Sequence, residues 1–139
     1  MPYYNALIRT HHITSRKKVS VLKRAADSLN VFAILRSGGC PGIMYIEAKD
    51  KDAVESWVSV VRNLRYKDFQ LVSRPACVTI EEDLMKVEGK DKNDTQGRDK
   101  AFLGAGLEEV ESVKEFGNLM AKRGVWQWWR KGMGYVRGD

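Results

Sequence analysis

The order in which apolar runs alternate with amphipathic stripes leaves this chain of 139 residues few folds to choose from. Residues 4–10 (YNALIRT) are compatible with a short strand and end in a polar cluster. Ser15 then offers an N-cap for a helix that runs to about residue 29. Residues 31–35 (VFAIL) form a continuous apolar run of strand length, which predicts a central strand. The predicted buried stripe of the helix comprises Val19, Leu22, Ala26 and Leu29.

Two more strands and a second helix come next along the chain. Residues 37–42 are rich in turn formers and lead into residues 43–46 (IMYI), which we interpret as the hairpin partner of the preceding strand. Asp52 and Glu55 form a variant capping box for the second helix, and residues 69–72 predict a fourth strand. The predicted buried stripe of the second helix comprises Val54, Trp57, Val58, Val61 and Leu64.

The resulting order, β-α-β-β-α-β, predicts an α+β fold of the ferredoxin-like sandwich type. Residues 1–73 form this core in our prediction, with two helices on one sheet face and the other face open. Residues 81–111 hold ten acidic residues, five basic residues and four glycines, so we expect an acidic, flexible insertion. Residues 112–135 add C-terminal helices, the first of which ends at Gly124. The length fits a single domain over residues 1–139.

The net charge of the chain is concentrated at its N-terminal end. The first 26 residues hold six basic side chains and no acidic one, since Asp27 is the first acidic residue. The other 18 basic residues balance the 18 acidic ones, so this end accounts for the whole net charge of +6. A concentrated positive field attracts polyanions such as RNA. The six side chains are Arg9, Arg16, Lys17, Lys18, Lys23 and Arg24.

Three of the four tryptophans lie close together near the C-terminus. Trp126 and Trp129 are three residues apart, so they share a helical face and are predicted to lie in the core. Trp128 points elsewhere, and beside Arg130 and Lys131 it is a candidate platform on which a base stacks. For the cluster as a whole we favour packing into the core, and the exposed platform at Trp128 is the alternative interpretation.

Residues with catalytic chemistry are sparse. Residues 12–14 (HIT) match the H-x-T element of two-histidine phosphoesterases, but the second element that such a mechanism needs is absent. His11 and His12 are neighbours, and in a strand they point to opposite faces, so a shared metal is not expected. The glycines at 38–39 lack the lysine and Ser/Thr of a phosphate-binding loop. We therefore expect no enzyme activity, no metal and no cofactor.

Cysteines and acidic residues give no stronger metal signal. Cys40 and Cys77 have no partner at metal-ligand spacing, and we interpret them as the reduced thiols of a nuclear or cytoplasmic protein. Glu47, Asp50 and Asp52 have the right oxygen atoms for a divalent ion, but helix capping accounts for Asp52 without one. No apolar run approaches the roughly 20 residues that cross a bilayer, so no membrane partner is expected.

Several short motifs also recur in a recognisable order. They are residues 11–13 (HHI), the basic first helix, residues 41–47 (PGIMYIE), Trp57, residues 64–67 (LRYK), residues 115–119 (EFGNL) and residues 123–124 (RG). Together they resemble a eukaryotic domain found at the C-terminus of RWD-domain-containing proteins. That domain is similar to the C-terminal domain of the third pre-mRNA-processing factor of the spliceosomal di-snRNP. The resemblance covers about residues 6–72 and 112–135. It implies a ferredoxin-like fold with helical additions and, from the splicing factor, binding of small nuclear RNA at a duplex and its adjoining single strand.

Two functions follow from the charge and the resemblance. The first is a non-catalytic RNA-binding domain that contacts phosphates through the basic first helix. The second is a protein-interaction module of the RWD-linked type, in which the same helix docks on a partner with an acidic surface. The candidate nucleic-acid contacts are Arg9, His11, Lys17, Lys18, Lys23, Arg24, Arg65, Lys67, Trp128, Arg130 and Lys131.

Overall fold

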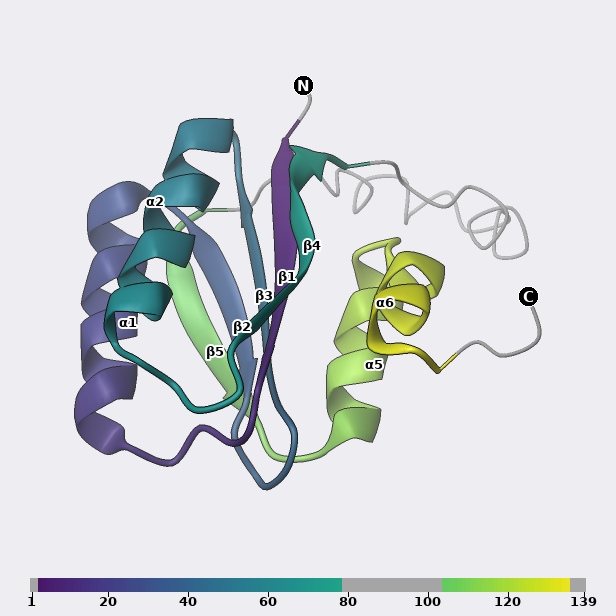
Figure 1. The fold of residues 1–139 in the computed structure, drawn as a ribbon. Coiled ribbons are helices and arrows are strands. Elements are labelled where there is room, and N and C mark those ends of the chain that lie inside the picture. Colours follow the sequence, from purple (N-terminus) through teal and green to yellow (C-terminus); the bar gives the residue numbers. More distant parts are fainter. Residues whose placement is uncertain (1–2, 79–103, 136–139) are drawn as a thin grey trace.

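The structure is a computed structural model that describes residues 3–78 and 104–135 (Figure 1). Its elements are β1 (Tyr4–Thr10), α1 (Arg16–Leu29), β2 (Phe32–Arg36), β3 (Gly42–Ala48), α2 (Lys51–Asn63), β4 (Gln70–Cys77), β5 (Gly106–Val110), α5 (Val113–Lys122) and α6 (Trp126–Met133). The strands form one mixed sheet in the order β4-β1-β3-β2-β5. All neighbouring strands are antiparallel except β5, which runs parallel to β2.

The sheet lies between two layers of helices. Helices α1 and α2 cover one face, and α5 and α6 cover the other (Figure 1). The predicted α+β class is confirmed, and the first six elements follow the predicted order. The arrangement is consistent with a ferredoxin-like type of fold. Within residues 3–78 and 104–135, no helix is long and apolar enough to span a membrane.

The layer of α1 and α2 follows from helical spacing. The predicted stripes are buried at Val19, Leu22 and Ala26 of α1 and at Val54, Trp57, Val58 and Val61 of α2. Leu29 and Leu64, at the ends of the two stripes, are partly buried and pack against the same core. Because side chains alternate along a strand, Ile8 of β1 and Met44 of β3 reach this layer from the sheet. One continuous core therefore joins both helices to the central strands.

The second face of the sheet is closed, and our expectation of an open face is wrong. Phe116 of α5 and Trp129 of α6 pack against Ile43 and Tyr45 of β3, and all four side chains are buried. Every residue of β3 is buried, which is the pattern of a strand covered on both sides. The two helices also approach closely at Gly117, where an added Cβ would lie 3.0 Å from the Trp129 ring.

The acidic segment contains a strand where we expected flexible chain. Residues 106–110 (GLEEV) form β5 at the edge of the sheet, in parallel register with β2. The two consecutive glutamates gave this segment the composition of a loop, but an edge strand tolerates charged side chains because part of it faces solvent. The rest of the predicted insertion, up to residue 103, lies outside the described residues.

The start of α2 differs from its predicted cap. Asp50 rather than Asp52 is the N-cap of α2, its side chain makes no capping hydrogen bond, and Asp52 lies inside the first turn. There the carboxylate favours the helix through the dipole rather than through a cap. A full capping box instead starts α5, where Ser112 and Glu115 each accept a hydrogen bond from the other's backbone.

A buried ion pair joins the end of β3 to the end of α5. The Glu47 side chain is fully buried, and the Arg123 guanidinium donates to both of its carboxylate oxygens, with Nε 2.9 Å from Oε1. The Tyr45 hydroxyl donates to the same Oε1 at 2.6 Å, and Asn5 Nδ2 lies 3.4 Å from that hydroxyl. Burial acts against the charge of both groups: it outweighs Arg123 and raises the pKa of Glu47, whereas the Glu47 carboxylate outweighs it at Arg123 and raises the pKa of Arg123.

Replacement of Trp57 should destabilise the fold strongly. The ring is fully buried between α1 and α2, and its Nε1 donates to the Leu22 carbonyl at 3.1 Å. We expect Trp57→Ala to cost about 3–5 kcal/mol in urea unfolding, because it leaves a large cavity. Trp57→Phe keeps most of the apolar volume and should cost clearly less. A Trp57→Ala midpoint equal to that of the parent would contradict this packing.

Candidate nucleic-acid interface

Helix α1 presents cations because its opposite side is tied to the core. Ser15 caps its start and accepts a hydrogen bond from the Lys18 backbone at 3.2 Å. Lys17 and Arg24 lie two turns apart on the exposed side, and Lys23 is exposed beside them. None of these three side chains forms an ion pair with any residue that the structure describes, although the charge of Lys23 contributes to the lowered pKa of Glu109. Their charge is therefore available to an anionic partner.

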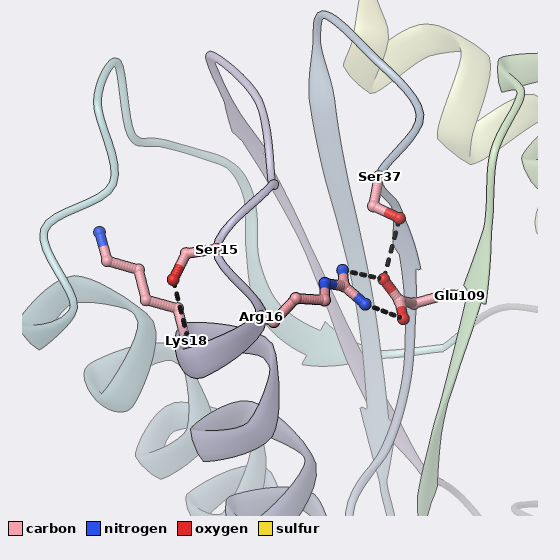
Figure 2. A network of polar contacts seen from close by, with 5 residues as sticks. All are labelled: Ser15, Arg16, Lys18, Ser37 and Glu109. Carbon is pink, nitrogen blue, oxygen red and sulfur yellow. Dashed lines mark hydrogen bonds and ion pairs between the residues drawn. The ribbon is translucent and has the colours of Figure 1, made fainter.

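Arg16, at the start of the same helix, is already paired. Its guanidinium donates to both carboxylate oxygens of Glu109 in β5, at 3.1 and 2.7 Å, and the Ser37 hydroxyl donates to the same carboxylate at 2.9 Å (Figure 2). The hydrogen bonds from Arg16 are the main reason that the pKa of Glu109 is lowered. Ninety-three positions separate Arg16 and Glu109, so sequence patterns gave no sign of the pairing. Among the six basic residues at the N-terminal end of the chain, Arg16 is therefore neutralised by a carboxylate of β5.

The loop between α2 and β4 brings further basic residues next to α1. Tyr66 is buried in this loop, and the Lys18 ammonium lies over its ring at 4.8 Å from the centroid. Arg65 and Lys67 flank Tyr66 and are exposed. Arg65 also adopts a left-handed backbone conformation (φ 57°), which is uncommon for a residue other than glycine. Lys18, Arg65 and Lys67 therefore gather at one end of α1.

The two histidines lie after β1 rather than within it, which corrects our expectation that they face opposite ways. Their rings lie side by side, with centroids 4.6 Å apart. His11 Nδ1 lies 3.5 Å from Asp68 Oδ2 and 3.7 Å from Cys40 Sγ, and the His11 backbone donates to the Lys67 carbonyl at 2.9 Å. The chain after β1 is thus joined to both neighbouring loops.

These residues border a pocket of about 760 Å³ at the end of β1. Arg9, His11, Asp68, Gln70 and Tyr135 are among the residues that line it. Arg9 and Gln70 also line a second pocket of about 440 Å³. Of this group, we anticipated Arg9 and His11 from the sequence. Gln70 and Tyr135 carried no sequence signal, because only the pairing of β1 with β4 and the return of the chain after α6 bring them here.

The tryptophan cluster is mostly structural. Trp129 is buried, and Trp126 is partly buried under the Arg130 guanidinium, 4.6 Å from the ring centroid. Trp128 is partly buried as well and packs edge-on against Tyr45, with centroids 5.8 Å apart. Our hypothesis of an exposed stacking platform at Trp128 is therefore wrong, because its ring helps to close the sheet face. Lys131 is exposed.

The predicted contacts consequently fall into three surface groups. The α1 group comprises Lys17, Lys18, Lys23 and Arg24, with Arg65 and Lys67 beside Lys18. The pocket group comprises Arg9 and His11. The α6 group comprises Arg130 and Lys131, which lie on the helix covering the other sheet face. No protein-family model matches the chain, and no curated protein matches it either.

Tyr66 makes the stability of the molecule sensitive to alkaline pH. Burial raises the pKa of Tyr66 to about 12 from 10, and its hydroxyl has no hydrogen-bond partner among the described residues. A raised pKa contributes stability that is complete below pH 10 and is lost as pH rises toward 12. Tyr66→Phe should leave stability at neutral pH unchanged or slightly higher, since the unpartnered hydroxyl is removed.

Urea unfolding at neutral pH and at about pH 11 measures this effect. The parent should lose about 1.4 kcal/mol more than Tyr66→Phe between the two conditions, because pH 11 lies about one pKa unit above the unfolded value. Burial also raises the pKa of Tyr3 to about 12, so Tyr3→Phe should reduce the alkaline loss further in the double variant. Equal losses in the parent and in Tyr66→Phe would show that the phenol is not buried as described.

Proposed function

We propose that this chain is a non-catalytic RNA-binding domain with a ferredoxin-like core, and that α1 provides its main phosphate-binding surface. The observation that carries the proposal is the set of exposed cations Lys17, Lys23 and Arg24, which make no ion pair with a described residue. Arg16, the residue before Lys17, shows the contrast because Glu109 neutralises it. Unpaired cations on one helix favour a polyanion over a small ligand.

The closed sheet determines the mode of binding that we propose. Unpaired bases commonly stack on an open sheet face, but α5 and α6 cover that face here. Contacts through lysine and arginine on a helix instead address the sugar–phosphate backbone, which gives affinity with little sequence information. A duplex or hairpin RNA is therefore the substrate class that suits the α1 group.

The resemblance to the RWD-linked domain and to the splicing factor supports the proposed fold more than the proposed ligand. Trp57 and Phe116, within the shared motifs, are fully buried, and Tyr66 is nearly so. Residues 42–47 of the PGIMYIE motif lie in the fully buried strand β3. Motifs made largely of core residues indicate a common structure. We propose the family relationship on that ground, with nuclear or cytoplasmic localisation as its corollary.

A protein-interaction module is the second candidate. It is favoured by the same closure of the sheet, because the surface for unpaired bases is lost while the charge of α1 remains. An acidic protein surface would also satisfy Lys17, Lys23 and Arg24. Crosslinking to RNA in cells, followed by mapping of the attached peptides, separates the two candidates. Nuclease-resistant capture of a partner without any RNA crosslink would favour the protein module.

Charge reversal on α1 tests the proposed RNA surface. Lys17, Lys23 and Arg24 lie away from the buried stripe, so their joint replacement by Glu should leave folding nearly intact. Binding to a hairpin RNA, followed by fluorescence anisotropy, should weaken at least about tenfold at low salt. The slope of log affinity against log salt should fall by about 2–3, because each lost phosphate contact contributes nearly one.

The matched control reverses three exposed lysines outside α1: Lys49, between β3 and α2, and Lys114 and Lys122 of α5. It changes the net charge by the same amount but leaves the α1 group in place. The control should keep most of the affinity and of the salt slope. The proposed surface is misplaced if the control loses as much RNA binding as the α1 variant. Parent affinity that does not change with salt would contradict the phosphate-binding mode.

A further inference from the structure

We propose that the pocket at the end of β1 binds one phosphorylated nucleoside, with Arg9 on the phosphate and Tyr135 beside the base. This nucleotide pocket is the space of about 760 Å³ that Arg9, Gln70 and Tyr135 help to line. The inference rests on the proposed function and deepens it, because it names a single nucleotide unit as a ligand separate from the duplex backbone. The unit is either a free nucleotide or the end of an RNA strand.

Arg9 is the candidate anion-binding residue of the pocket. It is half-buried in β1, and its guanidinium makes no hydrogen bond or ion pair with any residue in 3–78 or 104–135. It lies on the wall shared by the two pockets of about 760 and 440 Å³. A guanidinium that has lost part of its hydration is stabilised by a planar, bidentate acceptor such as a phosphate or carboxylate.

The other charged groups that line the pocket do not pair with the Arg9 guanidinium. Asp68 is the acidic residue of the lining, and its Oδ2 lies 3.5 Å from His11 Nδ1. The Cys40 thiol donates to the His11 carbonyl at 2.9 Å. These contacts hold His11, Cys40 and Asp68 to one another, so the phosphate position next to Arg9 remains for a ligand.

An aromatic ring and an amide complete the chemistry of a nucleotide site. Tyr135 is 39% exposed, and its contact with the Trp129 ring, edge-on at 5.4 Å, fixes its orientation. Phe69 also lines the pocket but lies under the Arg62 guanidinium at 5.1 Å, which leaves Tyr135 as the better stacking surface. Gln70 is directly opposite Arg9 in the β1–β4 pair, and its amide can donate and accept at a base edge.

The size of the space agrees with this ligand class. Sites for small organic ligands typically have volumes of about 300–1,000 Å³, and the pocket falls within that range although it is largely open to solvent. A bare phosphate would use Arg9 alone, and a neutral nucleoside would leave Arg9 without an anion. The combination of guanidinium, amide and exposed ring therefore predicts that phosphate and base are needed together.

Titration of the whole chain with three probes tests the pocket: uridine monophosphate, uridine and inorganic phosphate, each followed by NMR shifts of the backbone amides. Uridine monophosphate should saturate the shifts and bind at least about tenfold more tightly than either part alone. Arg9→Gln should weaken it about tenfold, and Tyr135→Ala about fivefold or more. The matched control, Arg74→Gln, removes an exposed arginine of β4 outside the pocket lining and should change the affinity less than about twofold.

A short single-stranded RNA with and without a 5′-phosphate distinguishes the source of the nucleotide. Tighter, phosphate-dependent binding than that of uridine monophosphate assigns the pocket to an RNA end. Equal binding assigns it to free nucleotides, and both results support the site. Inorganic phosphate that binds as tightly as the nucleotide, or an Arg74→Gln loss equal to that of Arg9→Gln, overturns the proposal.

Failure of the pocket and failure of the proposed function can be told apart. The α1 charge-reversal variant should still bind uridine monophosphate, since Lys17, Lys23 and Arg24 do not line the pocket. Loss of hairpin RNA binding by the parent, with nucleotide binding retained, would contradict the proposed function alone. Hairpin binding with no shift from uridine monophosphate would contradict the pocket alone.

Discussion

The contact between Glu47 and Arg123 is the interaction on which the two-sided architecture depends. A fully buried carboxylate at the end of the central strand β3 requires a partner, and the guanidinium at the end of α5 supplies it with two hydrogen bonds. Burial raises the pKa of Tyr45 well above its usual value, so its hydroxyl keeps the proton that it donates to Glu47. An apolar layer could slide over a sheet, whereas this contact fixes where α5 meets it.

The position of α5 and α6 in turn determines which surfaces remain for function. With these helices on the second face, Trp128 and Trp129 serve packing, and the aromatic surface of the sheet is closed to bases. The exposed cations of α1 remain on the opposite layer, and Arg9 remains at the end of β1, where the chain leaving α6 places Tyr135. The same docking thus separates the α1 surface that we propose for phosphate backbones from the pocket that we propose for one nucleotide.

Periodicity in the sequence was sufficient to predict most helices and strands, but not the contacts between residues far apart in the chain. The stripes of α1 and α2 and the hairpin of β2 and β3 were predictable, because local spacing encodes them. The unbroken apolar run at 43–46 also indicated that β3 is covered on both faces. The predicted core, with helices on one face of the sheet only, did not account for that run. From the sequence, Glu47 has the oxygen atoms of a metal ligand. In the structure it pairs with Arg123, which lies 76 positions later in the chain. The charged strand β5 was equally hidden, since its pairing with β2 and its contact with Arg16 are not local.

Urea unfolding of Glu47 and Arg123 variants tests this account most directly. Arg123→Met leaves the buried Glu47 carboxylate without its cation and should lower the free energy of unfolding by about 3–5 kcal/mol. Glu47→Gln keeps an acceptor for Tyr45 and, combined with Arg123→Met, removes the stranded charge, so the double variant should be more stable than Arg123→Met alone. A double variant whose loss equals the sum of the two single losses would show that the residues act independently, and would contradict the view that this ion pair docks the C-terminal helices.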